Sequence, residues 1–367
     1  MPNRSSTSSS EMKKSTRSAV VTLVGFLAVV IGAEVAARAW LPAIPPDAHT
    51  WPRAEIGQKL EQIDAYEERG EAVDVLFVGS SQMAASTNPQ LFTEQTGLSS
   101  YNAAFAGPSM RTVGRWLLDV VEPKLSPDVV VVGIASRDSN DRSRKNKNVH
   151  QAFLNSPGYR QETANLASQF EGWLEDVSVF MRYRRLMREP ATFLEGTDDD
   201  LGAQEIRMPI GERGLRLIEP VDYRFTLKGQ RRLANGTLGN FQTGGREYRA
   251  VVEMHDVLEE RGVEMILVNM PLTEDYLEAH EDVDADMTSY REFLEDIVAA
   301  TGVSFVDAEE AFATPKAFRD LLHLDVEGRD AFTEALADSW DDISDGAHLV
   351  MECNNKRTPE CKLHPAP

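Results

Sequence analysis

The chain has 367 residues, of which 42% are hydrophobic and 26% are charged. This composition is typical of a globular protein, and the length suffices for one large α/β domain with appendages. The formal net charge is −21, which argues against nucleic-acid binding because phosphate groups would be repelled.

The N-terminal segment differs in composition from the rest of the chain. Residues 1–18 are rich in serine and predominantly basic, and a largely apolar stretch follows at 19–41, interrupted by Glu34 and Arg38. A helix over 19–41 would be long enough to cross a hydrocarbon core of about 30 Å. The basic residues before it predict an uncleaved signal anchor in the cell membrane, crossing once, with residues 1–18 in the cytoplasm and the remaining domain outside it. A cleaved signal peptide is the alternative, since "AARA" resembles a small-residue cleavage site.

Beyond a predicted linker and helix at 42–72, apolar stretches rich in β-branched residues alternate with helix-favouring stretches. The predicted strands are 73–79, 99–107, 127–136, 263–270 and 303–308, and the predicted helices are 55–70, 88–97, 109–125, 245–261, 286–301 and 326–340. Such alternation predicts an α/β domain, over residues 73–345, with a parallel central sheet that is covered by helices on both faces.

Residues 139–245 break this alternation and are predicted to form an insertion. The insertion includes the basic stretch "RSRKNKN", which we expect to be a solvated loop, and a predicted helix at 162–188. Two roles remain open for the insertion: a surface excursion, or a lid over an active site.

The C-terminal tail, residues 346–367, is predicted to be poorly ordered apart from a short disulfide loop between Cys353 and Cys361. Such a bond fits an oxidising compartment, and two free thiols are the alternative. No cluster of cysteine, histidine and acidic residues has the spacing of a metal site, so neither a metal nor a cofactor is predicted.

Polar residues with catalytic potential follow the first predicted strand and precede the last predicted helix. The strand 73–79 ends in Gly-Ser-Ser, with Ser81 as the last residue, and Asp320 and His323 lie three residues apart. In an open parallel sheet, ligands bind beyond the carboxyl ends of the strands. A serine there becomes a nucleophile only when a base takes its proton and a third group orients that base. We therefore predict that Asp320 and His323 form the acid–histidine half of a catalytic triad, whose serine comes from the end of another strand, where Ser80 and Ser81 lie.

Three short blocks, "FVGSS", "NAAFAG" and "DLLHLDVEG", make the chain resemble the SGNH/GDSL hydrolase superfamily. The resemblance covers roughly residues 73–138 and 263–340. It implies a flavodoxin-like three-layer α/β/α fold, with Ser81 as the nucleophile. It also implies an oxyanion hole formed by the N–H groups of Ser81 and Gly107.

The third block of that family departs from the expected pattern. The family usually has Gly-x-Asn-Asp, whose asparagine donates to the oxyanion, whereas this chain has "GIASRDSN", with Ser136 or Arg137 near that place. A lost oxyanion donor typically costs about 10²–10³ in rate. The remaining histidines, among them His150, His255 and His280, lack a catalytic context and are expected at the surface or in helices.

Three functions are consistent with these features. The first is an extracytoplasmic, membrane-anchored serine esterase that acts on small esters or on acylated glycans of the cell envelope. The second is an O-acyltransferase, resembling membrane-tethered relatives, that moves an acyl group onto an envelope polysaccharide with the help of a membrane-bound acyl-donor partner. The third is a catalytically inactive relative that binds polymer or acts as a scaffold, which the missing asparagine motivates.

Overall fold

The computed structural model describes residues 9–40, 51–163, 173–174, 177–182, 209–312, 314–354 and 358–366. The chain forms two compact units. One comprises residues 1–48 and 164–204, and the other comprises residues 49–163 and 205–367. The second unit therefore includes the helix that precedes the first strand, the C-terminal tail, and both ends of the predicted insertion.

The first unit contains the helices α1 (Ser9–Trp40) and α11 (Val179–Arg182). Glu34 and Arg38 of α1 form an ion pair of 2.7 Å, and Glu34 also accepts hydrogen bonds from Ser178 and from the backbone of Val179. The predicted transmembrane segment 19–41 falls on α1 except for its last residue. Among the described residues, no helix has both the length and the apolar character that crossing a membrane requires, so the structure does not confirm this prediction. Most of the predicted helix at 162–188 lies outside the described residues.

The second unit is built on a seven-stranded sheet with the strand order β2-β1-β3-β4-β5-β6-β7. The strands are β1 (Val75–Gly79), β2 (Ser100–Asn102), β3 (Val129–Ile134), β4 (Glu264–Asn269), β5 (Ser304–Asp307), β6 (His348–Cys353) and β7 (Cys361–Pro365). The order of the first five strands is the flavodoxin-like order, whose switch point lies between β1 and β3. All five predicted strands are present.

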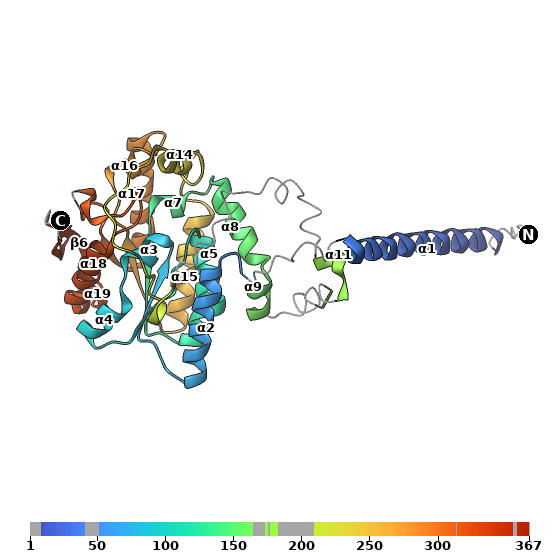
Figure 1. The fold of residues 1–367 in the computed structure, drawn as a ribbon, viewed down its shortest axis with the longest axis horizontal. Coiled ribbons are helices and arrows are strands. Elements are labelled where there is room, and N and C mark those ends of the chain that lie inside the picture. The colour runs from blue at the N-terminus through green and yellow to red at the C-terminus, as the bar shows by residue number, and fades with distance from the viewer. Residues whose placement is uncertain are drawn as a thin grey trace, which may run out of the picture. The chain divides into compact units, whose positions relative to one another are not determined.

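Helices cover both faces of this sheet, as Figure 1 shows. α18 packs against α3 and α4 on one face, and α15 packs against α5 and α17 on the other. The helices of this unit are α2 (Ala54–Arg69), α3 (Ser81–Ser86), α4 (Pro89–Thr96), α5 (Met110–Trp116), the π-helical turn η2 (Leu117–Val121), α6 (Glu122–Leu125), α7 (Ser136–Ser139), α8 (Arg144–Leu154), α9 (Pro157–Glu162), η3 (Glu212–Gly214), α14 (Leu227–Asn235), α15 (Arg246–Glu260), α16 (Glu274–Leu277), α17 (Val283–Thr301), η4 (Pro315–Ala317), α18 (Val326–Asp338) and α19 (Trp340–Ser344).

The C-terminal tail departs from the prediction. β6 pairs in parallel with β5, and β7 pairs antiparallel with β6, so the sheet is not parallel throughout. Cys353 lies directly opposite Cys361 in this antiparallel pair, and the predicted disulfide joins them. The tail is therefore an ordered edge of the sheet, because backbone pairing adds to the covalent bond.

The basic stretch that was expected to be a loop instead begins a helix. Ser143 caps α8 by accepting a hydrogen bond of 3.1 Å from the backbone N–H of Asn146. α8 then buries Val149 and Phe153 against the core while its basic side chains remain outside. The apolar residues spaced along one side of α8 therefore favour a helix here, although the stretch begins with several charged residues.

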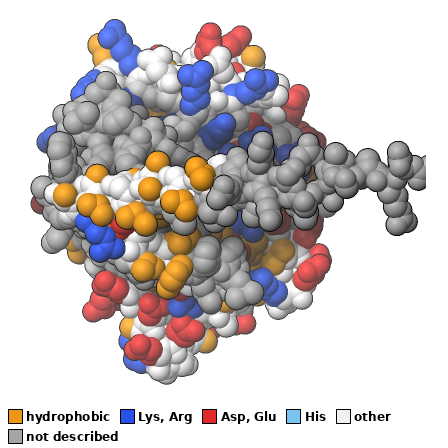
Figure 2. Space-filling model, turned by 90° about the vertical axis from the view of Figure 1, so that its right-hand side faces the viewer, with side chains coloured by type: hydrophobic (Ala, Val, Ile, Leu, Met, Phe, Trp, Pro, Cys, Tyr) orange, Lys and Arg blue, Asp and Glu red, His pale blue; other side chains and the backbone are white. Residues whose placement is uncertain are grey.

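The surface of the molecule carries charges of both signs. On the face drawn in Figure 2, acidic and basic side chains are interspersed. This distribution agrees with an acidic chain whose charged residues are spread along its sequence.

Candidate active site

Ser81 is placed at the carboxyl edge of the sheet by a sharp turn between β1 and α3. Gly79 ends β1 with a φ of +152°, and a Cβ at this position would lie 2.7 Å from the carbonyl oxygen of Gly133 on the neighbouring strand. Only glycine therefore fits at this position. Ser80 precedes the first turn of α3, and Ser81 is the first residue of that helix. The turn thus presents the Ser81 side chain at the switch point of the sheet.

His323 and Asp320 lie in a tight loop that leads into α18. The backbone pairs Phe318 with Leu324, and the N–H of Arg319 donates to the carbonyl oxygen of His323 at 2.9 Å. Asp320 Oδ1 accepts the backbone N–H of His323 at 3.0 Å. The loop's own hydrogen bonds therefore hold the carboxylate close to the imidazole, independently of Ser81.

The structure brings the three predicted side chains into one hydrogen-bonded chain. His323 Nδ1 lies 2.9 Å from Asp320 Oδ1, and His323 Nε2 lies 2.9 Å from Ser81 Oγ. Ser81 is 5% exposed and the side chain of His323 is 19% exposed. This is the order of nucleophile, base and orienting acid that acyl transfer requires.

The charge state of Asp320 suits an orienting role. Burial by itself raises the pKa of Asp320, but the neighbouring His323 and the hydrogen bonds from His323 and from two backbone N–H groups outweigh it. The pKa of this carboxyl group therefore lies well below its usual range. An ionised Asp320 accepts the N–H of His323 Nδ1, which leaves Nε2 to take the serine proton.

The two backbone N–H groups predicted to bind the oxyanion have no other acceptor among the described residues. Within the described ranges, the N–H groups of Ser81 and Gly107 donate to no other group. Gly107 has a φ of +88° in the loop that follows β2. Their place in the oxyanion hole remains a prediction, which their availability favours.

The other two predicted oxyanion residues make contacts of their own. Ser136 Oγ lies 2.8 Å from the hydroxyl of Tyr276 and 3.1 Å from Nε2 of His280. Arg137 Nε donates to Asp138 at 3.0 Å. The Ser136 hydroxyl is therefore committed to a buried polar network, and a role for either residue at the oxyanion stays a prediction.

Two of the histidines that were expected at the surface or in helices are buried. His280 is 6% exposed and also contacts Asp286 through Nδ1 at 3.1 Å, while His150 is 8% exposed and lies on α8. The expectation holds for His150, which lies in a helix, and is wrong for His280, which is buried between α16 and α17. A single sequence carries no signal for such burial, because the partners come from distant segments.

Sequence reasoning missed a buried ion pair next to the nucleophile. Arg216 is 4% exposed and approaches the carbonyl oxygen of Ser81 at 3.4 Å and a carboxylate oxygen of Glu55 at 3.6 Å. Glu55 in turn accepts the backbone N–H of Ala106 at 3.0 Å. The pair therefore links the nucleophile turn to the loop that carries Gly107.

The segment that carries Arg216 is anchored by Lys59. The Lys59 ammonium donates to the carbonyl oxygen of Asn102 at 2.5 Å and to that of Gly214 at 2.9 Å. Gly214 has a φ of +73°, and a Cβ there would lie 2.1 Å from the same Asn102 oxygen. Part of the predicted insertion is therefore packed against the sheet edge beside the nucleophile.

Comparison with known proteins gives structural matches only. No family model matches the chain, and no curated protein matches it. A putative acylhydrolase from Bacteroides fragilis NCTC 9343 is similar over 77% of this chain and 95% of its own, with 11% identity and a TM-score of 0.39. A GDSL-like lipase from Bacteroides thetaiotaomicron VPI-5482 is similar over 78% of this chain and 98% of its own, with 12% identity and a TM-score of 0.37. An acetyl xylan esterase from the rumen bacterium Butyrivibrio proteoclasticus is similar over 75% of this chain and 64% of its own, with 11% identity and a TM-score of 0.34.

Proposed function

We propose that this protein is a serine hydrolase of the SGNH/GDSL type. Its particular activity is the cleavage of acyl esters through Ser81, His323 and Asp320. The observation that supports this most directly is the continuous contact from Asp320 through His323 to Ser81, with both links at 2.9 Å. A serine that only forms a turn would not be expected to contact a histidine that is itself held by a carboxylate.

In the first half of the reaction, Ser81 Oγ attacks the acyl carbon of the ester while His323 Nε2 takes the hydroxyl proton. Asp320 stays ionised and stabilises the imidazolium that forms. The negative charge that develops on the carbonyl oxygen is accepted by the N–H groups of Ser81 and Gly107. His323 then gives its proton to the alcohol, which leaves, and the acyl group remains on Ser81.

The second half of the reaction releases the acyl group by the same steps. A water molecule gives a proton to His323 as its oxygen attacks the acyl carbon, and the Ser81–acyl bond breaks as His323 returns the proton to Ser81 Oγ. A sugar hydroxyl in place of that water would make the protein an O-acyltransferase. The two outcomes differ only in the acceptor.

Acyl esters of cell-envelope glycans, outside the membrane, are the proposed substrates. The sequence supports this location by the basic residues 1–18 before the apolar stretch 19–41, which would act as the anchor. The disulfide between Cys353 and Cys361 fits an oxidising compartment. Recovery of the full chain from the soluble fraction of the cytoplasm would contradict both the anchor and the location.

Turnover of p-nitrophenyl acetate by the purified full chain tests the esterase proposal. We expect Ser81→Ala to abolish turnover and Ser80→Ala, its immediate neighbour, to retain it, because Ser80 makes no hydrogen bond to His323 among the described residues. Equal turnover by wild type and Ser81→Ala would refute the proposal. Adding an oligosaccharide and measuring acylated sugar against free acetate distinguishes transfer from hydrolysis.

A further inference from the structure

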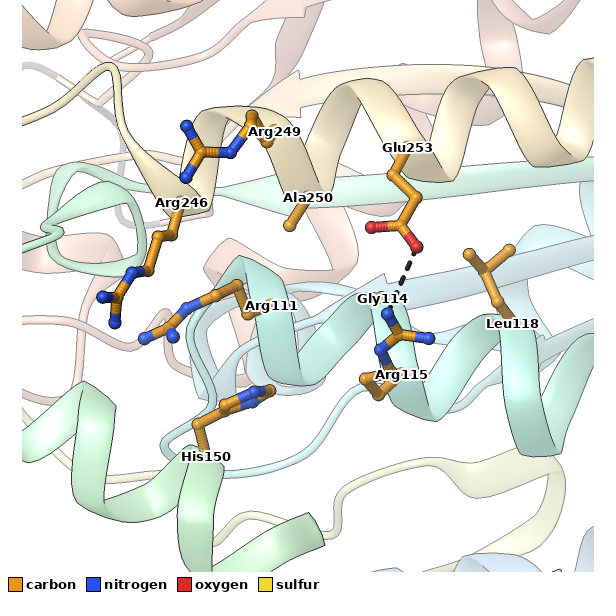
Figure 3. A pocket seen from close by; sticks show the side chains of 9 residues that line it. All are labelled: Arg111, Gly114, Arg115, Leu118, His150, Arg246, Arg249, Ala250 and Glu253. Carbon is orange, nitrogen blue, oxygen red and sulfur yellow. Dashed lines mark hydrogen bonds and ion pairs between the residues drawn. The ribbon is translucent and has the colours of Figure 1, made fainter. Parts of the chain in front are cut away.

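A second site of unassigned purpose lies between three helices of the larger unit. A cavity of about 230 Å³ is lined by residues of α5, α8 and α15, with Leu118 from the following turn. None of the three triad residues lines it. Its wall, drawn in Figure 3, is formed by Arg111, Gly114, Arg115, Leu118, His150, Arg246, Arg249, Ala250 and Glu253. Four arginines around one cavity are unexpected in a chain with a net charge of −21.

Two of the four guanidinium groups are neutralised by carboxylates. Arg111 Nε donates to the fully buried Glu247 at 2.7 Å. Arg115 approaches Glu253, which also lines the cavity, at 3.2 Å and Asp119 at 3.8 Å. These ion pairs fix the position of the two α5 arginines without adding net positive charge to the cavity.

The other two arginines have no carboxylate partner among the described residues. Arg246 and Arg249 form no ion pair with any residue in the described ranges. They lie three positions apart on α15 and therefore share one side of that helix. The backbone N–H groups of Gly245 and Arg246 already donate to the carboxylate of Asp141, both at 2.6 Å. An anion in the cavity would thus be bound by arginine side chains and not by the helix N-terminus.

The imidazole of His150 lines the same cavity and carries no charge at neutral pH. Its Nδ1 lies 3.1 Å from the hydroxyl of Thr112. Burial, together with the nearby guanidinium groups of Arg111 and Arg115, lowers the pKa of His150 to about 4. Among the described lining residues, Arg246 and Arg249 are therefore the positively charged side chains without an ion pair at neutral pH.

We propose that this cavity binds a tetrahedral dianion of the phosphate or sulfate class, either free or as a monoester. The charge of a dianion matches the two guanidinium groups that have no ion pair within the described ranges, whereas a single carboxylate would neutralise only one. Guanidinium groups bind such oxyanions through paired, charge-assisted hydrogen bonds. The volume of about 230 Å³ is several times the roughly 30 Å³ that one water occupies in the liquid. It therefore accommodates the anion with part of an esterified group.

Isothermal titration of the full chain, purified in a non-ionic detergent, with inorganic phosphate tests this proposal. We expect the double variant Arg246→Gln/Arg249→Gln to weaken phosphate binding at least about tenfold, which corresponds to about 1.4 kcal/mol. The matched control is Lys228→Gln/Arg231→Gln, which removes two exposed charges with the same spacing from α14 and should bind phosphate as the wild type does.

Further arms of the titration separate the ligand classes. Sulfate should bind comparably to phosphate, and acetate at least about tenfold more weakly. Glucose 1-phosphate that binds as tightly as phosphate would point to an esterified ligand, and exclusion of the sugar phosphate would point to the free ion. Undetectable phosphate binding at millimolar concentration, acetate binding equal to phosphate, or a double variant that binds like wild type would overturn the proposal. Ser81→Ala should bind phosphate normally, so this result is independent of the proposed esterase activity.

Discussion

Replacing Asp320 by asparagine changes the hydrogen bonding of the histidine while preserving the shape of the side chain. In the native arrangement His323 Nδ1 lies 2.9 Å and 3.0 Å from the two carboxylate oxygens. The backbone N–H groups of Leu322 and His323 donate to Oδ1, at 2.9 Å and 3.0 Å. Asparagine has only one oxygen, and the two backbone donors will hold it in the Oδ1 position. The amide nitrogen then replaces Oδ2 and faces Nδ1 as a donor.

A donor facing Nδ1 stabilises the tautomer of His323 that carries its proton on Nε2. That N–H points toward Ser81 Oγ, 2.9 Å away, and cannot accept the serine proton. We expect kcat for p-nitrophenyl acetate to fall about 10⁴-fold, the loss that a wrong histidine tautomer causes in Ser-His-Asp enzymes. This fall corresponds to about 5.5 kcal/mol of transition-state stabilisation.

The matched control is Asp325→Asn. Asp325 caps α18 by accepting the backbone N–H of Gly328 at 2.7 Å, and asparagine caps helices about equally well. This variant loses the same charge five residues away, so its kcat should stay within about twofold of wild type. An Asp320→Asn protein that retains more than about a tenth of the wild-type kcat would refute the reasoning that Asp320 orients His323.

Three further predictions follow from buried or covalent contacts. Arg216→Met removes the guanidinium beside the Ser81 carbonyl, and we expect kcat to fall about tenfold or more with little change in KM; steady-state kinetics with kcat unchanged would contradict a positioning role. Replacing Cys353 and Cys361 by serine opens a loop with a sequence separation of 8 and should lower the free energy of unfolding by about 2–3 kcal/mol, measured by urea denaturation against the oxidised wild type. Burial lowers the pKa of Lys59 to about 7. Between pH 7 and about 10 the unfolded chain therefore binds more protons than the folded chain, and the free energy of unfolding should rise with pH across that window. A Lys59→Met variant that shows the same rise would assign the rise to other groups.

Features that depend on local sequence could be predicted. The stretch "VVVVGI" forms β3 because its β-branched residues favour a strand that is buried on both faces. Ser81 lies far from Asp320 and His323 in the sequence, but all three could be predicted to lie close together in space. They follow strands of one sheet, at its carboxyl edge. The topology, together with short blocks in a fixed order, thus carries most of the information about the triad.

Features that depend on distant partners could not be predicted. β6 and β7 are partly polar, and they are held by pairing with the edge of β5, by pairing with each other and by the disulfide. Arg216 lies in a polar stretch that resembles a solvated loop, and only the folded chain buries it beside Ser81. The cavity lined by Arg246 and Arg249 could not be predicted either, because α5 and α15, which form two of its walls, lie more than 100 residues apart in the chain.

The central claim is that Ser81 is a nucleophile activated by His323, and covalent labelling tests it most directly. The full chain is treated with a fluorophosphonate, and the modified peptide is mapped by mass spectrometry. The account predicts a single modified serine at position 81, with labelling lost in His323→Ala and retained in Ser80→Ala. A correctly folded protein that remains unlabelled, or a label at another serine, would contradict it.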